Sequence, residues 1–282
     1  MANQQDIQFH YDVDNDFFKL FLDQKYKVYS CAVWDNVTTL EEAQFNKLKR
    51  IADFAHIKPG QHILDIGCGW GGMLEYCLKE RSVKSACGLT LSDAQYQAIY
   101  KKCHPHLTVH LQSWRDFKSA SFDAIISIGA MEHFVTLQDR KLNKHIDIYR
   151  DFFRKCFELS KEQAYLGLQT IIALKKPDSL SSLKDVHYLL NHVFPGSALP
   201  EMQDLRIAAE NMYELIELRT LKLDYAQTLI EWRKRLNQNK EYVIDCYGKE
   251  LWKHYNKYFS AAERSFAHGY TALAQMSFKK TI

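Results

Sequence analysis

Glycine is scarce in this sequence: 11 of the 282 residues, about half of its usual frequency in proteins. Four of the eleven occur within six consecutive positions, at Gly67, Gly69, Gly71 and Gly72. Because the rest of the chain has so few glycines, a cluster this dense indicates a segment whose backbone has a special task.

Long apolar runs and paired cysteines are also missing. The longest nearly apolar stretch, 124–131, is far shorter than the roughly 18 residues that span a bilayer, and the N-terminal sequence has no apolar signal-peptide core. The seven cysteines form an odd set without a C-x-x-C pair, which argues against a disulfide framework and against a thiolate zinc site. We therefore expect a cytoplasmic protein without a metal, whose thiols are reduced and mostly buried.

Charge is unevenly distributed. The net charge is +3, but residues 219–282 carry +6 and the preceding part −3. This pattern is typical of a solvated helical face, or of docking to an acidic surface such as an acidic carrier protein or the head groups of a membrane. Acidic residues interleave with the basic ones and the pI is 8.3, so we expect no nucleic-acid partner. The oligomeric state is not predicted.

The 46% of hydrophobic residues, with 13% aromatic, suffice for a core and exclude disordered and fibrous proteins. No repeat or flexible linker divides the chain, which predicts one domain over 1–282. Helices are expected over 16–22 and, from the capping-box spacing at Thr39, over 39–55. They form an N-terminal helical cap, 1–58.

From residue 60 onward, short apolar runs alternate with longer helical patterns. This alternation predicts an α/β fold: a doubly wound, mostly parallel seven-stranded sheet with helices on both faces. A helix-rich segment at about 177–212 is a candidate lid. The expected strands are 62–66, 84–89, 107–111, 122–128, 165–171, 213–223 and 270–279, and the expected helices begin at 71 and cover 93–102, 144–159 and, as two helices, 227–268.

The glycine cluster follows an apolar strand and opens a helix, where glycines let the backbone lie against a ligand. Asp65, Gly67, Gly69 and Gly71 match D-x-G-x-G-x-G of S-adenosylmethionine binders, while three glycines match G-x-G-x-x-G of dinucleotide binders. The dinucleotide pattern also needs an acid at the end of the second strand, and none occurs there before Asp93. A methyl-donor site is favoured; a dinucleotide site and a purely structural turn stay open.

Further motifs sharpen this prediction. The segments 10–12 (HYD), 15–18 (NDFF), 29–32 (YSCA), 64–71, 88–92 (GLTLS) and 127–134 (SIGAMEHF) together resemble the cyclopropane fatty acid and mycolic acid cyclopropane synthase family. The likeness covers nearly the whole chain. It implies a Rossmann-like class I methyltransferase that uses S-adenosylmethionine to modify a carbon–carbon double bond of an unsaturated acyl chain in lipid biosynthesis, giving a cyclopropane or a methyl branch.

The resemblance also implies a donor site. Gln95 would offer an amide to the ribose hydroxyls and Trp114 a flat face to adenine; the alternative for Trp114 is a core aromatic. Together with Asp65, Gly69 and Gly71 of the glycine segment, the residues expected around the donor are Tyr29, Ser30, Gly67, Thr90, Leu91, Gln95, Trp114 and Ile128.

For catalysis, the resemblance implies a bound bicarbonate as the base that closes the ring, held by residues matching Cys31, Glu132, Tyr225 and Ile128. Glu132 follows a strand end, where ligands of open sheets collect; alternatively it is a helix N-terminal acid. His133 is a weaker candidate base, better explained as a structural neighbour.

One position departs from the family. Where the family has a bicarbonate-binding histidine, this chain has Gln169, which can donate a hydrogen bond but cannot become a cation. This difference bears on ring closure, which uses the bicarbonate, much more than on methyl transfer. If the acyl prediction holds, Phe18, Phe21, Leu189, Phe194 and Tyr225 should line a long apolar tunnel.

Two alternatives stay open. One is a methyltransferase for a small amine, isoprenoid or other secondary metabolite, which needs no bicarbonate. The other is a non-catalytic S-adenosylmethionine-binding module, which the presence of Cys31, Glu132 and Tyr225 argues against.

Overall fold

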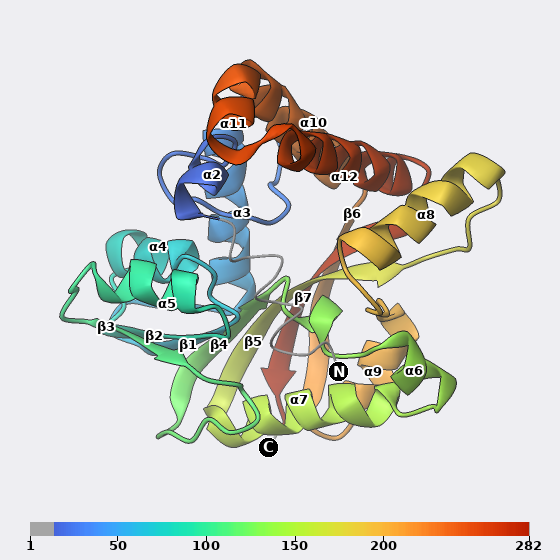
Figure 1. Cartoon of the computed structure of the whole chain (residues 1–282). Coiled ribbons are helices and arrows are strands. Elements are labelled where there is room, and N and C mark those ends of the chain that lie inside the picture. The colour runs from blue at the N-terminus through green and yellow to red at the C-terminus, as the bar shows by residue number, and fades with distance from the viewer. Residues whose placement is uncertain (1–13, 282) are drawn as a thin grey trace.

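The computed structural model describes residues 14–281, and its centre is a seven-stranded sheet of order β3-β2-β1-β4-β5-β7-β6 (Figure 1). The first five strands in the chain pair in parallel, and β7 runs antiparallel to both β5 and β6. The predicted doubly wound, mostly parallel sheet is confirmed. The strands are β1 His62–Ile66, β2 Ser85–Thr90, β3 Leu107–Leu111, β4 Phe122–Ile128, β5 Ser160–Ala173, β6 Tyr213–Leu221 and β7 Thr271–Lys280.

Successive residues of the central strands supply cores on opposite faces of the sheet. Ile63 and Ile126 pack with α3 and α4 on one face, whereas Leu64 and Ile125 pack with α7 and α9 on the other. Strands buried on both faces read as continuous apolar runs, which is how β1 and β4 could be predicted. The flanking helices are α3 Leu40–Phe54, α4 Gly72–Glu80, α5 Asp93–Tyr100, α7 His145–Leu159 and α9 Met202–Ala209.

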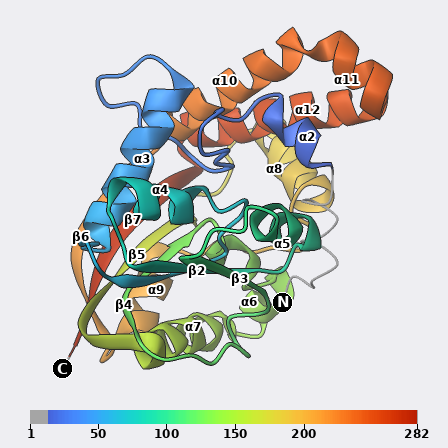
Figure 2. The same ribbon diagram turned by 90° about the vertical axis from the view of Figure 1, so that its left-hand side faces the viewer.

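A third layer of helices lies beyond the sheet, above it in Figures 1 and 2. It contains α10 Leu223–Gln238, α11 Lys240–Tyr247 and α12 Lys249–Ala267. The prediction of two helices over 227–268 was wrong. Asn239 ends α10, and Gly248, with φ at +87°, separates α11 from α12; this positive φ favours glycine.

The expected lid segment, 177–212, is divided between two places. Helix α8 (Leu180–His192) packs on α12, where Asp185 forms a two-pronged ion pair with Arg264, with N···O distances of 2.7 Å. Helix α9 packs instead on α7, on the opposite side of the sheet. The part of the segment that lines the predicted site thus runs from Val186 to Leu199, and α9 does not line it.

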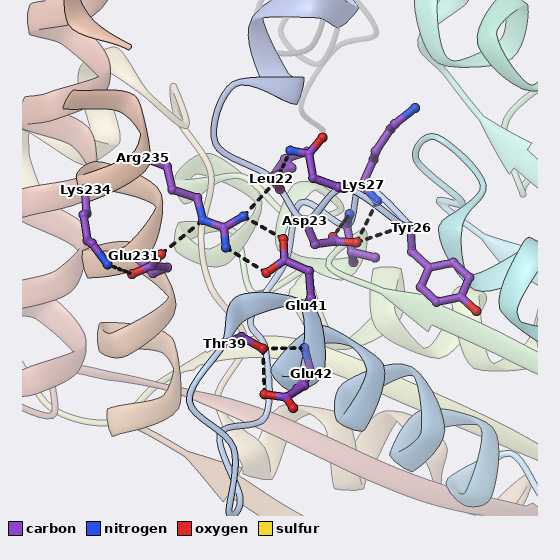
Figure 3. A network of polar contacts seen from close by, with 12 residues as sticks. Leu22, Asp23, Tyr26, Lys27, Thr39, Glu41, Glu42, Glu231, Lys234 and Arg235 are labelled. Atoms are coloured by element: carbon purple, nitrogen blue, oxygen red, sulfur yellow. Dashed lines mark hydrogen bonds and ion pairs between the residues drawn. The ribbon is translucent and has the colours of Figure 1, made fainter. Parts of the chain in front are cut away.

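The N-terminal helices join this layer to the sheet. Helix α2 (Asn15–Lys19) is shorter than predicted, and α3 begins after Thr39, whose hydroxyl accepts from the backbone N–H of Glu42. Arg235 of α10 donates to both carboxylate oxygens of Glu41 at 2.8 and 2.9 Å (Figure 3). The motif at 10–12 lies outside the described residues.

Over residues 14–281 no helix combines the length and apolar character needed to cross a bilayer. All seven cysteines are free, and five of them are buried, as expected.

Candidate active site

Two adjoining cavities open at the carboxyl ends of the parallel strands, where ligands of such sheets bind. The larger, of about 350 Å³, is walled by the segments that follow β1, β2 and β4, by residues 27–30 and by part of α3. We call it the strand-end cavity. It brings together most of the predicted donor residues: Tyr29, Ser30, Asp65, Gly67, Gly69, Thr90, Leu91, Gln95, Trp114 and Ile128.

The glycine segment forms one wall. Gly69 has φ at +55°, and a Cβ placed there would meet nothing within 4 Å, so the space beside it is open for a ligand. Gly71, by contrast, is the N-cap of α4 and does not line the cavity. Gly72 lines it instead, and a Cβ there would lie 2.3 Å from the backbone oxygen of Tyr26. Gly71 therefore shapes the turn, while its neighbours face the cavity.

The wall beyond β2 presents hydrogen-bonding groups. The Thr90 hydroxyl donates to Gln95 Oε1 at 2.8 Å, and Ser92 caps α5 by accepting from the backbone N–H of Gln95. Because Gln95 Oε1 accepts from Thr90, the group of this side chain that remains for a ligand is the Nε2 donor. A donor at this place matches the predicted role toward ribose hydroxyls.

Trp114 lies both in the core and in the wall of the strand-end cavity. Its ring packs edge-on against Phe152 in the core, with centroids 5.5 Å apart, and it also lines the strand-end cavity. The Arg115 guanidinium lies 4.3 Å from the ring centroid. Trp114 is 8% exposed, so part of its surface remains available to a ligand.

Asp65 and Lys47 bring opposite charges to the same wall. Burial raises the pKa of Asp65 to about 7, partly offset by the Lys47 charge. Burial lowers the pKa of Lys47 to about 8. Asp65 Oδ1 has no hydrogen-bond partner among residues 14–281, so this oxygen is available to a ligand that can donate.

The second cavity, of about 150 Å³, is walled mainly by apolar side chains of α8, α10 and α12, and we call it the apolar cavity. Tyr29, Ser30, Gly129 and His133 line both cavities, which therefore adjoin. The expected Leu189, Phe194 and Tyr225 line the apolar cavity. The expected Phe18 and Phe21 do not: they pack into an aromatic cluster with Tyr255 beneath α12.

Glu132 lies in a short 3₁₀ turn, Met131–His133, directly after β4. Its Oε1 accepts from the backbone N–H of Ile171 on β5 at 2.7 Å, and its Oε2 has no hydrogen-bond partner within residues 14–281. Burial raises the pKa of this carboxyl to about 7. A three-residue turn is no extended helix, so the position of Glu132 beside the apolar cavity favours the catalytic interpretation over the helix N-terminal one.

Gln169 sits next to Glu132 in the wall of the apolar cavity. It faces Gln275 across the β5–β7 ladder, and Gln275 Nε2 donates to its Oε1 at 2.8 Å. In the described part of the chain, Gln169 Nε2 has no acceptor. At the position where the resemblance implies a histidine, this chain therefore has an amide whose unpartnered group within residues 14–281 is a donor.

The other two predicted catalytic residues are placed differently. Burial lowers the pKa of His133 to about 4, so its imidazole is neutral at pH 7, and its ring lies 5.8 Å from that of Phe194. Cys31 lines neither cavity; its thiol donates to the carbonyl of Ala32 at 3.1 Å, and burial raises its pKa. The Cys31 thiol therefore does not face the site.

Sequence reasoning missed several lining residues. Lys47 had a detectable signal, since it is a lysine on the otherwise apolar face of α3 with Ala43, Leu48 and Ile51. The helical residues of the apolar cavity had none, because their spacing is that of any core-facing helix. They are Leu229, Trp232, Tyr258, Ala262 and Phe266.

A sheet of this order, with an antiparallel β7 and a glycine segment after β1, defines the class I S-adenosylmethionine-dependent methyltransferases. Comparisons with known proteins narrow the class. Residues 1–276 match the family described as mycolic acid cyclopropane synthetase. The chain belongs to this family.

Individual relatives agree. The chain is 31% identical to cyclopropane mycolic acid synthase 2 of Mycobacterium bovis, over 97% of this chain and 94% of that protein. It is 33% identical to hydroxymycolate synthase MmaA4 of Mycobacterium tuberculosis, over 93% and 88%. The solved structure of mycolic acid cyclopropane synthase CmaA1, complexed with SAH and CTAB, superposes with a TM-score of 0.88 at 29% identity, covering 99% of this chain and 98% of that one.

The protein is therefore an S-adenosylmethionine-dependent methyltransferase of the cyclopropane synthase type, and the predictions of family, fold, enzyme class and methyl donor are confirmed. The predicted action on an unsaturated acyl chain is supported by these relatives. The strand-end cavity fits the donor, because it combines an open glycine wall, an amide donor at Gln95 and an aromatic face at Trp114.

Proposed function

We propose that this enzyme methylates a carbon–carbon double bond of an unsaturated acyl chain held in the apolar cavity, giving a cyclopropane or a methyl branch. The observation that carries the proposal is the contact between the two cavities. A cavity with polar groups for the donor adjoins an apolar one, with Tyr29, Ser30 and His133 at the junction. This arrangement suits a reaction between a nucleotide-like donor and an apolar acceptor.

S-adenosylmethionine, when bound, supplies an electrophilic methyl group on a sulfonium. Gln95 and Trp114 would hold its adenosine part, and the glycine segment would lie against it. Tyr29 and Ser30 would lie beside the reacting end, since they also line the apolar cavity. The residues of the junction thus orient the donor toward the acyl chain and exclude water from between them.

Methylation of an alkene leaves positive charge on the acyl chain. The Glu132 carboxylate, fixed through Oε1 at the Ile171 amide, lies in the cavity wall where that charge develops. Aromatic faces at Tyr225 and Tyr258 line the same cavity. A fixed carboxylate and ring faces lower the energy of a cation without capturing it.

Ring closure also needs a base, and we propose that bicarbonate is held beside Glu132. The donor set supports this assignment because Gln169 directs an amide N–H group without an acceptor in residues 14–281, which suits an anion. Gln169 contributes no positive charge, so it would bind the anion less tightly than a protonated histidine could. Tyr225 lines the same wall.

A second candidate acceptor is a small amine or isoprenoid, which Gln169 favours because such reactions need no bicarbonate. The test is incubation of the purified enzyme with methyl-labelled donor and, separately, unsaturated acyl chains and amines. We expect label in the acyl product as a gain of one CH2, with ring and branch separated by NMR. Label confined to amines contradicts the acyl proposal.

The carrier of the acyl chain would be an acidic protein. Arg233, Lys253, Lys257 and Arg264 line an open groove between α10 and α12, while Tyr258 and Ala262 of α12 line the apolar cavity. Asp185, Glu250 and Glu263 offset part of the positive charge. To test this, Lys257→Glu should lower kcat/KM for carrier-bound substrate severalfold and leave kcat/KM for the free acid unchanged. Equal effects on the two substrates, or an effect only on substrate in anionic vesicles, contradict an acidic carrier protein.

A further inference from the structure

Lys47 is a buried cation next to the donor site. It is fully buried on α3, and its Nζ donates to the hydroxyl oxygen of Ser30 at 3.0 Å. Within residues 14–281 this is its only hydrogen bond, and no carboxylate lies within ion-pair distance. Burying an ammonium that is not directly paired costs considerable free energy, so this placement indicates a function.

The surrounding contacts hold residue 30 in one position. Gln44, one helical turn before Lys47, donates through Nε2 to the backbone oxygen of Ser30 at 2.8 Å. The preceding turn is fixed by Asp23, whose carboxylate accepts from the backbone N–H groups of Tyr26, Lys27 and Val28 at 2.7 to 3.1 Å. Figure 3 shows Asp23 with two of these contacts, beside the Arg235–Glu41 ion pair that ties α3 to α10. Helix α3 and this turn thus fix the position of Ser30 in the wall of the strand-end cavity.

The chemistry of the pair sets the direction of the Ser30 hydroxyl. An ammonium has donors only, so Ser30 Oγ must accept from Lys47, and the hydroxyl hydrogen is then available to an acceptor. Ser30 lines both cavities and is 8% exposed, whereas Lys47 has no exposed surface. Lys47 therefore acts on a ligand through Ser30, as a positioning residue.

The group that accepts the hydrogen bond from Ser30 can be identified from the shape of S-adenosylmethionine. Its adenosine part belongs at Gln95 and Trp114, and its sulfonium must lie near the apolar cavity, at the end where Ser30 is found. The anionic group at that end of S-adenosylmethionine is the carboxylate of its methionine moiety. We propose that Lys47, through Ser30, binds this carboxylate and so sets the orientation of the methyl group toward the acyl chain.

Electrostatics agrees with this assignment. Burial disfavours the Lys47 ammonium, while the carboxyl groups of Asp23 and Asp65 that face it favour the charged form; the Cys31 thiol nearby is neutral, because burial raises its pKa. The resulting pKa, about 8, leaves Lys47 largely protonated at pH 7. A hydroxyl that accepts from a cation donates more strongly to an anion than a hydroxyl that accepts from a neutral group.

The test compares two ligands that differ in the amino-acid part. S-adenosylhomocysteine carries the carboxylate, and 5′-methylthioadenosine lacks the whole amino-acid part. Calorimetry on the full chain should show that Lys47→Met weakens S-adenosylhomocysteine binding about ten- to a hundredfold, with methylthioadenosine binding unchanged. Lys49→Met, which removes an exposed lysine of the same helix, should change neither.

Ser30→Ala provides the independent check, since it removes the hydroxyl without emptying the core. It should cause a similar selective loss, and the double variant should lose little more, because the two residues act as one unit. Equal weakening of both ligands in Lys47→Met shows a merely structural role and overturns the proposal. Unchanged S-adenosylhomocysteine binding in Ser30→Ala overturns it as well, even if Lys47→Met fails to fold.

Discussion

The two cavities are built in different ways. The strand-end cavity is walled by backbone turns at the ends of β1, β2 and β4, with a few polar side chains at defined places. The apolar cavity is walled mainly by side chains of α8, α10 and α12. The first therefore depends on chain conformation, and the second on the size and shape of side chains.

This difference distinguishes the features that bind the methyl donor from those that select the acceptor. Turns at strand ends require glycines and caps at fixed spacings, which restrict the sequence and suit one donor. Helix faces can change side chains with little effect on the fold. Acceptor specificity is therefore expected to depend on the helical layer, and donor binding on the sheet. The variants below test this separation.

The largest effect is expected for Gly69→Val. Gly69 has φ at +55° and faces open space, so valine adds backbone strain and places a branched side chain where the donor lies. Donor binding should fall below detection by calorimetry. Gly60→Val is the matched control, because Gly60 has φ at +80° and no neighbour within 4 Å but lies on an exposed turn. Equal loss of donor binding in both variants would show that backbone strain, rather than blocking of the donor site, causes the loss.

Glu132→Gln should affect turnover and leave the donor in place. Glutamine can still accept from the Ile171 amide through Oε1, so the variant removes charge with little change of shape. We expect kcat to fall about a hundredfold, with S-adenosylhomocysteine affinity within twofold of the native value. Glu158→Gln, an exposed position on α7, serves as the control. Full activity in Glu132→Gln would contradict the charge-stabilising role.

The pH profile provides a test that needs no substitution. Burial raises the pKa of Glu132 to about 7, and the proposed charge-stabilising role requires its ionised form. Single-turnover rates at saturating donor should therefore rise about tenfold per pH unit below pH 7 and level off above it. His133, with a pKa near 4, is neutral throughout that range. The rise should be absent in Glu132→Gln; its persistence there would assign the titration to another group.

The sequence predicted the sheet better than the helical layer. Strands β1, β3 and β4 have the predicted bounds, because apolar runs ended by turn residues define them locally. Strand β5 extends from Ser160 to Ala173, beyond the predicted 165–171, since pairing with β7 continues to Ala173 and pairing with β4 reaches back to Ser160. Long-range pairing of this kind leaves no local pattern. The third C-terminal helix was missed because Asn239 and Gly248 interrupt an amphipathic pattern that otherwise continues.

The same contrast holds for the site. The resemblance to the family was enough to predict that Gln95 and Trp114 lie in the strand-end cavity, which they line. Gly71 was assigned one position too early, because only the structure shows that Gly72 faces the cavity. Trp232 and Phe266 of the apolar cavity could not be separated from core residues, since burial against a neighbour and burial around a ligand require the same apolar spacing.

The smallest effect is expected for Gln169→His, which acts on the product rather than on the total rate. The Gln275 amide, which now donates to Gln169 Oε1, can turn so that its Oε1 accepts from one ring nitrogen of the histidine, and the pair across β5 and β7 can persist. Both ring nitrogens can then carry a proton, and the resulting cation binds an anion more tightly through the other nitrogen. We expect the ring share of the product, and its dependence on added bicarbonate, to rise severalfold, while total methyl transfer stays within about threefold. NMR of the acyl product measures both.

The control for this variant is the double change with Gln275→Leu, which removes the group that orients residue 169. If Gln275 fixes the ring of the new histidine, the gain in ring share should disappear while methyl transfer persists. A loss of total transfer without any shift in ring share would mean that position 169 shapes the apolar cavity and does not hold an anion. That result would make product choice depend on the shape of the apolar cavity, to which β5 contributes residue 169 beside the helical side chains.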